Sequence, residues 1–236
     1  MHMATKIDTL TNLREAPAYT IGEASAYLRL PVATLRSWLV GRPYATATGN
    51  RRSEPLIALA DKKGIRLSFV NLVEAHVLSA VRRQHGVELD NIRHAIKYAE
   101  KKFGAKRPLV DQEFATNGVD LFIEHLGLLL NASKHGQLGI RDVLSTYLKR
   151  IERDPTGIPI KLFPFTRRSE NLDQPRKIQI DPRISFGRPV ISGTGIRTEI
   201  LFERFLSGEN TKQLAQDYDR PEEEIQEAIR YEQLAA

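Results

Sequence analysis

The sequence predicts an α+β protein that is mainly helical. Apolar residues recur at helical spacing along most of the 236 residues, alternating runs are few and short, and glycine and proline separate the periodic segments. These patterns divide the chain into a flexible arm (1–18), a helical front (19–104), a mixed α/β middle region (105–170) and a small helical C-terminal domain (177–236), which a short β-strand begins.

Two short helices with a sharp break between them open the front. Thr20 and Glu23 have the spacing of a capping box at the start of the first helix, and Leu30-Pro31 ends it. The second helix spans 32–39. Its apolar positions are expected to face inward: Val32, Leu35 and Leu39. Its outward positions are small or polar, as in a helix that lies in a DNA major groove: Thr34, Arg36 and Ser37. Two core helices of a small bundle would show the same apolar spacing.

A basic hairpin and two longer helices complete the front. Residues 41–55 read as a loop, and 56–69 read as a β-hairpin with its turn at 61–64. The loop carries side chains of the kind that touch the DNA backbone beside a winged helix-turn-helix: Arg42, Tyr44, Asn50, Arg51 and Arg52. For Arg51 and Arg52 the alternative is a solvated surface pair. Helices are expected at 70–83, before Gly86, and at 90–103, before Gly104.

The rest of the chain is predicted from shorter patterns. In the middle region we expect two short strands, a helix and a further strand, at 120–125, 127–131, 140–151 and 159–165. A polar stretch, 166–176, reads as a linker. The C-terminal domain is expected to have a strand, several turns and three short helices, with the strand at 177–180 and the helices at 198–207, 211–218 and 221–233.

The charge of the chain is unevenly distributed. Its net charge is +6, and residues 29–66 contain eight lysines and arginines but only two acids. Residues 209–236 contain eight acids and three basic residues. Because cations that neutralise phosphates release counterions, the front favours nucleic acid and the acidic end does not. The last two helices have helix-turn-helix spacing, but their acids favour packing or a protein-binding face.

The composition excludes several function classes. The chain has no cysteine, which excludes disulfides, thiolate nucleophiles and cysteine-ligated zinc and leads us to expect a reducing, cytoplasmic location. No apolar run approaches the length of a membrane span, and the first residues lack an apolar secretory core. The six histidines lack metal-ligand spacing, Gly193-x-Gly195 lacks the third glycine of a dinucleotide site, and no catalytic motif is present. We therefore expect no metal, no cofactor and no enzymatic activity.

Residues 19–104 resemble the winged helix-turn-helix of MerR-type regulators. The run Thr34-Leu35-Arg36-Ser37-Trp38 stands where that family has a threonine, a leucine, an arginine and two aromatic residues, with Ser37 replacing one aromatic. The resemblance implies binding to operator DNA. A homodimer that places its second helices in successive major grooves would read a pseudo-palindromic site.

The C-terminal domain is similar to the bacterial family called domain of unknown function 433, which includes VapB-type antitoxins. The similarity rests on the run from Ile180 to Ile196, with Gly193-Thr194-Gly195-Ile196 where the family usually has glycine-threonine-arginine-isoleucine. It implies an antitoxin that neutralises a PIN-like ribonuclease toxin and represses its own operon. Such nucleases hold Mg²⁺ with clustered acids, which an antitoxin cation could occupy. The candidates lie among turns: Arg183, Arg188 and Arg197. Solvation or capping of those turns is the alternative for each.

A second function remains open. The chain would be a MerR-type ligand-responsive transcription regulator without a toxin partner if residues 105–170 formed a sensor. A neighbouring toxin gene would favour the antitoxin, and a responsive efflux or metabolic gene would favour the regulator.

Overall fold

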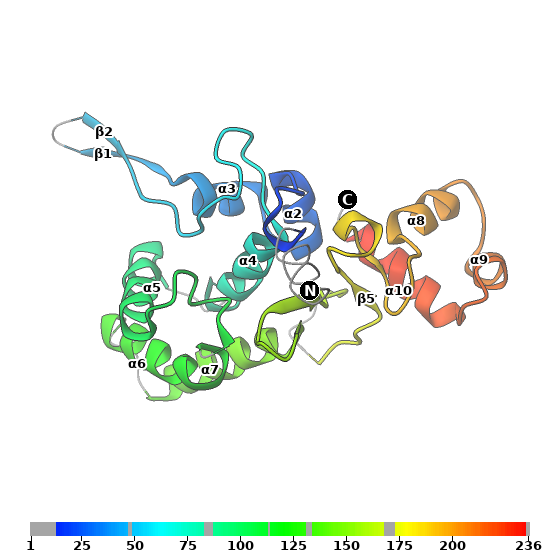
Figure 1. Ribbon diagram of the computed structural model, residues 1–236. Coiled ribbons are helices and arrows are strands. Elements are labelled where there is room, and N and C mark those ends of the chain that lie inside the picture. The colour runs from blue at the N-terminus through cyan, green and yellow to red at the C-terminus, as the bar shows by residue number, and fades with distance from the viewer. Residues whose placement is uncertain are drawn as a thin grey trace, which may run out of the picture.

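The structure is a computed structural model that describes residues 13–46, 49–82, 87–112, 114–130, 134–167 and 173–234. Within these ranges the fold is α+β and mainly helical, as predicted, and its strands form two-stranded antiparallel sheets. Figure 1 shows a helical body from which one hairpin projects, with the C-terminal helices packed beside it.

The body is built around α4 (Phe69–Arg82), whose residues are buried from Phe69 to Val81. This helix packs against α2 (Ile21–Leu28) on one side and α7 (Lys134–Leu148) on another (Figure 1). One continuous hydrophobic cluster extends from Tyr19 to Ile180. The boundary expected at 104/105 therefore does not separate two cores, because the middle region and the front bury their apolar faces against each other.

The first two helices are α2 and α3 (Val32–Val40). The capping box is present: the Glu23 amide donates to the Thr20 hydroxyl at 3.2 Å, and the Thr20 amide donates to the Glu23 carboxylate at 2.8 Å. The inward face of α3 is formed by Leu35, Trp38 and Leu39. Val32, which was expected inside, is 49% exposed because it lies in the first turn of α3, beyond the packed part of that helix.

The basic hairpin lies earlier in the chain than predicted. Strands β1 (Pro43–Thr46) and β2 (Gly49–Arg52) pair within the segment that was expected to be a loop. The strands predicted at 56–60 and 65–69 are wrong, because this segment contains only isolated bridges. Its turn lies close to where it was predicted and is closed by the bridge between Asp61 and Arg66. Its apolar residues sit in the core as loop residues, whereas the true strands are exposed on both faces and carry no alternating apolar pattern.

The middle region is more helical than predicted. Helix α5 (Leu89–Phe103) ends at Gly104, as expected, but the strands predicted at 120–125 and 127–131 are wrong. A short π-helix (Phe114–Gly118) leads into α6 (Val119–Leu129) instead. The buried positions of α6 follow helical spacing: Val119, Phe122, Ile123 and Leu126. Asn131 and Gly86, the predicted ends of two elements, lie outside the described residues.

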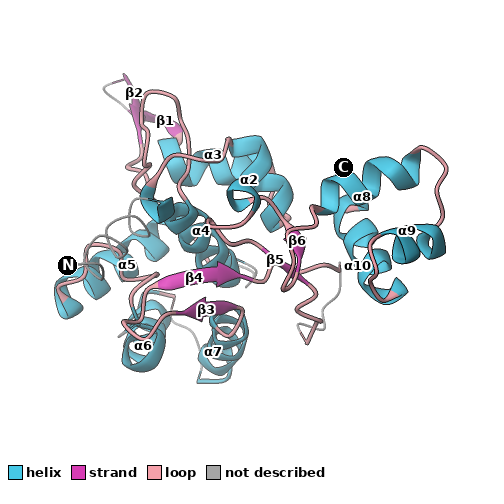
Figure 2. Ribbon diagram, turned by 45° about the vertical axis from the view of Figure 1, so that its right-hand side comes forward, coloured by secondary structure: helices cyan, strands magenta, loops and turns pink. Residues whose placement is uncertain are grey.

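Two short sheets connect the body to the C-terminal helices (Figure 2). The expected helix over 140–151 is α7, which begins and ends earlier, so that Ile151 starts β3 (Ile151–Arg153). Strand β3 pairs with β4 (Pro159–Leu162), and the last residue of β4 forms a bridge with Ile180. Next to that bridge, β5 (Ile178–Gln179) pairs with β6 (Val190–Ile191).

The C-terminal domain has its own small core. A single-turn 3-10 helix (Ser185–Gly187) precedes three short helices, namely α8 (Thr198–Leu206), α9 (Thr211–Asp217) and α10 (Glu222–Gln233). Their buried faces form a cluster around Leu201, Leu214 and Tyr231, separate from that of the body. Gly193 and Gly195 lie in the turn between β6 and α8, as predicted.

The described end of the expected arm is attached to the body. Arg14 is 4% exposed and pairs with Asp154 at 3.2 Å, and Glu15 pairs with Arg107 at 3.2 Å. Residues 1–12 of that arm lie outside the described residues. Among the described helices, none combines the length and the apolar character needed to cross a bilayer.

Candidate DNA-binding surface and C-terminal domain

Helix α3 carries three of the predicted DNA contacts. Arg36 is exposed, while Thr34 and Ser37 are half-buried. The Ser37 hydroxyl donates to the Thr34 carbonyl at 2.7 Å, which occupies it within the helix. Arg36 is therefore the side chain of α3 with the longest reach toward a groove.

The hairpin carries the other five. In its register Tyr44 lies opposite Arg51, Ala45 opposite Asn50 and Pro43 opposite Arg52. Directly opposite residues share a face of a two-stranded ribbon, so Tyr44 and Arg51 lie on one face, and Asn50 and Arg52 lie on the other. These side chains are exposed, as a surface that meets a phosphate backbone requires.

The base of the hairpin is held to the end of α3. The Arg42 amide donates to the Ser53 hydroxyl at 2.9 Å, and the Arg52 guanidinium donates to the Val40 carbonyl at 3.2 Å. Gly41 has φ +74°, and a Cβ there would lie 1.9 Å from the Ser53 carbonyl oxygen. Only glycine fits, and it brings the hairpin close to the end of α3.

A cleft of about 960 Å³ lies between this hairpin and the start of α5. Five arginines line it, three from the hairpin segment together with Arg82 and Arg93, and three acids do so as well. Arg93 pairs with Asp90 and donates to the Glu54 carbonyl at 3.0 Å. Of the predicted site residues, the cleft therefore brings together Arg42, Tyr44, Arg51 and Arg52, while Asn50 and the three residues of α3 lie outside it. Arg82 and Arg93 were missed because only the fold brings their helices to the hairpin.

The three arginines predicted to meet a toxin lie elsewhere, around the turns of the C-terminal domain. Arg183 forms a two-pronged pair with the fully buried Asp181, at 2.9 and 2.6 Å. Arg188 lies between Glu23 of α2 and Glu199, at 3.5 and 3.6 Å. Arg197 is 3.9 Å from Glu199. Each has a carboxylate partner within the chain, and each side chain is still more than one third exposed.

The C-terminal domain docks on α2 through aromatic residues. The Tyr231 hydroxyl donates to the Tyr27 carbonyl at 3.1 Å, and the Tyr19 hydroxyl donates to the Gly187 carbonyl at 3.1 Å. Arg29, in the turn between α2 and α3, places its guanidinium 4.3 Å from the centre of the Tyr231 ring and donates to the Tyr231 carbonyl. The turn between α2 and α3 thus packs against α10.

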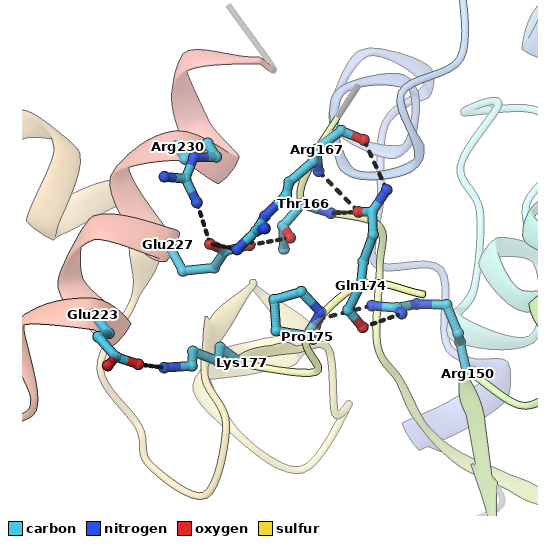
Figure 3. A network of polar contacts seen from close by, with 9 residues as sticks. All are labelled: Arg150, Thr166, Arg167, Gln174, Pro175, Lys177, Glu223, Glu227 and Arg230. Carbon is cyan, nitrogen blue, oxygen red and sulfur yellow. Dashed lines mark hydrogen bonds and ion pairs between the residues drawn. The ribbon is translucent and has the colours of Figure 1, made fainter. Parts of the chain in front are cut away.

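The expected linker also carries specific contacts, shown in Figure 3. Glu227 of α10 accepts from the Thr166 hydroxyl and pairs with Arg167 at 3.0 Å and with Arg230. Burial raises the pKa of Glu227, but the hydrogen bonds from Arg167 and Thr166 outweigh this and hold it below its usual value. On the other side, buried Arg150 donates to backbone carbonyls at both ends of the segment. Residues 168–172 of the predicted linker lie outside the described residues.

Two buried ionisable groups of α4 lie away from the hairpin and from the turns of the C-terminal domain. Burial raises the pKa of Glu74 to about 7, against the opposing effects of Arg107 and Asn71. Burial lowers the pKa of His76 to about 3, and its Nε2 lies 3.1 Å from the Tyr147 carbonyl oxygen. Neither is part of a group of potential metal ligands, and no such group occurs among the described residues.

Comparison with known families assigns the two parts separately. Residues 178–231, the unit built from β5 to α10, match the family described as "Protein of unknown function (DUF433)". The chain carries a DUF433 domain. Residues 17–96, from the capping box of α2 into α5, match a "Putative DNA-binding HTH domain". The DUF433 domain is thus joined to a helix-turn-helix that docks on it.

Relatives of similar length cover both parts. The chain is 29% identical over 233 residues to a Mycobacterium tuberculosis protein named "Putative antitoxin VapB45", covering 91% of this chain and 93% of that protein. It is 23% identical over 239 residues to the uncharacterized protein Rv2308 of the same organism, covering 94% and 93%. The crystal structure of Rv2018 from Mycobacterium tuberculosis superimposes with a TM-score of 0.65 at 23% identity, over 91% of this chain and 98% of that one. Most of the fold of this chain is therefore shared with a solved structure.

Proposed function

We propose that this chain is an antitoxin that also binds operator DNA and represses its own operon. The observation that carries the proposal is that one chain combines a helix-turn-helix, with an exposed basic hairpin, and a DUF433 domain. Over most of both chains it is similar in sequence to a relative named "Putative antitoxin VapB45". No enzymatic activity is part of the proposal.

The DNA contacts divide by their chemistry. Helix α3 would enter the major groove with Arg36 toward base edges, and Thr34 and Ser37 near the backbone at the groove wall. Arg42, Tyr44, Asn50, Arg51 and Arg52 would contact the flanking backbone, as the wing of a MerR-like domain does. A homodimer would place its two α3 helices one helical turn, roughly 34 Å, apart or a multiple of that distance.

Salt-dependent binding tests the DNA half. Fluorescence anisotropy with the chain's own promoter fragment between about 50 and 200 mM salt gives the slope of log affinity against log salt. Arg36→Ala combined with Arg51→Ala should weaken binding, and loss of the phosphate contact of Arg51 should reduce the steepness of that slope by about 0.9, doubled in a homodimer. Arg52 is left in place because it also supports the hairpin.

The matched control for charge is Lys212→Ala, an exposed cation on α9, away from the basic surface. It should leave affinity and slope unchanged. A double variant whose affinity and slope equal those of wild type would overturn the assignment of this surface.

The partner half of the proposal concerns the DUF433 domain, which would hold and block a PIN-like ribonuclease toxin. The exposed sides of Arg183, Arg188 and Arg197 are its candidate contacts with the nuclease's Mg²⁺-binding acids, as charge-assisted pairs. Co-expression with the protein encoded next to this chain should rescue growth from that protein's toxicity and yield a co-purifying complex.

The rival function is a ligand-responsive regulator. A cleft of about 430 Å³ lies between the described end of the arm, residues 106–112 and residues 156–159, and its volume is within the range of small-molecule sites. Absence of toxicity and of any complex in the co-expression experiment would favour this reading, and ligand screens by thermal shift would then follow.

A further inference from the structure

The single-turn helix of the DUF433 domain presents an aromatic side chain in an unusual way. Ser185, Phe186 and Gly187 have successive φ values of +48°, +57° and +74°, all in the left-handed region. Phe186 is 93% exposed, more than any other large apolar side chain among the described residues. A bulky residue with positive φ is uncommon, and a fully exposed phenylalanine contributes almost no burial.

The turn that carries Phe186 is rigidly held. The Gly187 amide donates to the Ile184 carbonyl at 2.9 Å, and the Arg188 amide donates to the Ser185 carbonyl at 3.1 Å. The Ser185 hydroxyl donates to the Gly195 carbonyl at 3.1 Å, which ties the turn to the next loop. From the helix-turn-helix side, the Tyr19 hydroxyl donates to the Gly187 carbonyl, so both ends of the turn are fixed.

Neither the conformation nor the exposure of Phe186 helps the chain to fold. A glycine or asparagine would relieve the left-handed backbone, and a polar side chain would suit the solvent better. Strained residues persist where the surrounding structure over-determines them, and such positions cluster at functional sites. An aromatic ring on a fixed backbone has only two side-chain torsions to lose on binding, which suits an interface anchor.

The charges around the turn indicate the chemistry of the partner. The carboxylate of Asp181 is fully buried, while the side chain of its partner Arg183 is 38% exposed, so that pair presents its cationic side to solvent. Arg188, two residues after the ring, is 39% exposed and lies between Glu23 and Glu199, at 3.5 and 3.6 Å. A pocket with an apolar floor and carboxylates at its rim would accept the ring and meet the exposed side of Arg183, and its carboxylates would compete with Glu23 and Glu199 for Arg188.

We propose that Phe186 is the anchor through which the DUF433 domain docks on its toxin, filling an apolar pocket with an acidic rim. This inference rests on the proposed function and deepens it, because it assigns the central contact to an aromatic residue and leaves the arginines at the periphery. It also separates the toxin-binding turn from the DNA-binding surface of α3 and the hairpin.

The test compares the affinity of two variants for the protein encoded next to this chain, measured by isothermal titration or by surface binding. Phe186→Gly removes the ring and relieves the backbone, so its thermal midpoint should equal or exceed that of wild type. Phe186→Ala removes the ring and retains the Cβ. Both should bind the toxin at least about 30-fold more weakly and bind DNA as wild type does.

The matched control is Leu206→Ala, which removes a 68% exposed apolar side chain at the end of α8 in the same domain. Its toxin affinity should stay within about twofold of wild type, as expected for truncation outside a hot spot. Phe186→Trp, which keeps a large ring, should retain most of the affinity.

Three results would overturn the inference. If wild type binds the toxin and both Phe186 variants bind equally well, the anchor is wrong and the proposed function stands. If the variants lose self-association while their toxin affinity is unchanged, the ring serves an interface between two copies of this chain. If wild type forms no complex at all, the proposed function fails and this assignment fails with it.

Discussion

Arg150 binds the segment that connects the body to the DUF433 domain, and replacing it should destabilise the protein strongly. This residue is 3% exposed, and its guanidinium donates to four backbone carbonyls: those of Phe163 at 2.6 Å, Gln174 at 3.0 Å, Pro164 at 2.9 Å and Pro175 at 3.2 Å. It also lies 4.5 Å from the centre of the Phe165 ring. Burial lowers its pKa to about 10, so it remains a cation at neutral pH.

Arg150→Met keeps the length and apolar stem of the side chain and removes every donor. An acceptor left unsatisfied in the interior costs about 1–3 kcal/mol, and four carbonyls lose their partner. Allowing for partial hydration of the less buried ones, we expect a loss of about 4–6 kcal/mol in the free energy of unfolding. This is a large share of the roughly 5–15 kcal/mol that stabilises a typical domain. Arg150→Lys, with a single ammonium, should recover about half of it.

Urea unfolding followed by far-UV circular dichroism and by tryptophan fluorescence measures this loss. Trp38 lies in the body, so fluorescence reports the body and circular dichroism reports the whole chain. In Arg150→Met both transitions should move together to lower urea, because the segment that joins the DUF433 domain to the body loses its buried donor while the contacts of Tyr231 and Tyr19 with the other part remain.

The control for this substitution is Arg220→Met, which breaks a partly exposed pair with Glu224 on the surface of α10, at 2.7 Å. It should cost less than about 1 kcal/mol. If Arg150→Met costs no more than this control, water satisfies the four carbonyls and the reasoning is refuted.

Three further predictions concern the core, the hairpin and the docking of the two parts. His76 should lower the free energy of unfolding by about 2 kcal/mol between pH 7.5 and 5, because the unfolded state protonates near pH 6.5 while the folded pKa is about 3. Glu74, with its pKa raised to about 7, acts in the opposite direction over the same range, so the test is the difference between His76→Phe and wild type: equal pH profiles of the urea midpoints would argue against this. Gly41→Ala should displace the hairpin, since its Cβ would meet the Ser53 carbonyl oxygen at 1.9 Å, and weaken DNA binding about tenfold in anisotropy with little change in thermal midpoint. Tyr231→Phe leaves the Tyr27 carbonyl without its 3.1 Å donor and should cost about 1–2 kcal/mol in urea unfolding; a neutral substitution would mean that the docking does not depend on this bond.

Local signals in the sequence were sufficient for much of the fold. The capping box at Thr20 and the left-handed Gly104 mark real helix ends, because caps depend on residues within one turn of each other. The same holds for the three C-terminal helices and the turn at Gly193. The prediction of strands over α6 was wrong, although the apolar residues of this segment follow the spacing of a helix and therefore predict one.

The sequence by itself determined the helical class, the helix-turn-helix with its outward Arg36 and the basic front, all of which depend on neighbouring residues and on composition. Only the tertiary structure decided the features that depend on contacts between residues far apart in the sequence. It placed the basic hairpin at 43–52, where both strand faces are exposed and leave no periodic pattern. It placed Arg150 on carbonyls up to 25 residues away and Tyr231 on Tyr27, 204 residues away. No local pattern encodes such partners, because they become neighbours only when the hydrophobic cores form.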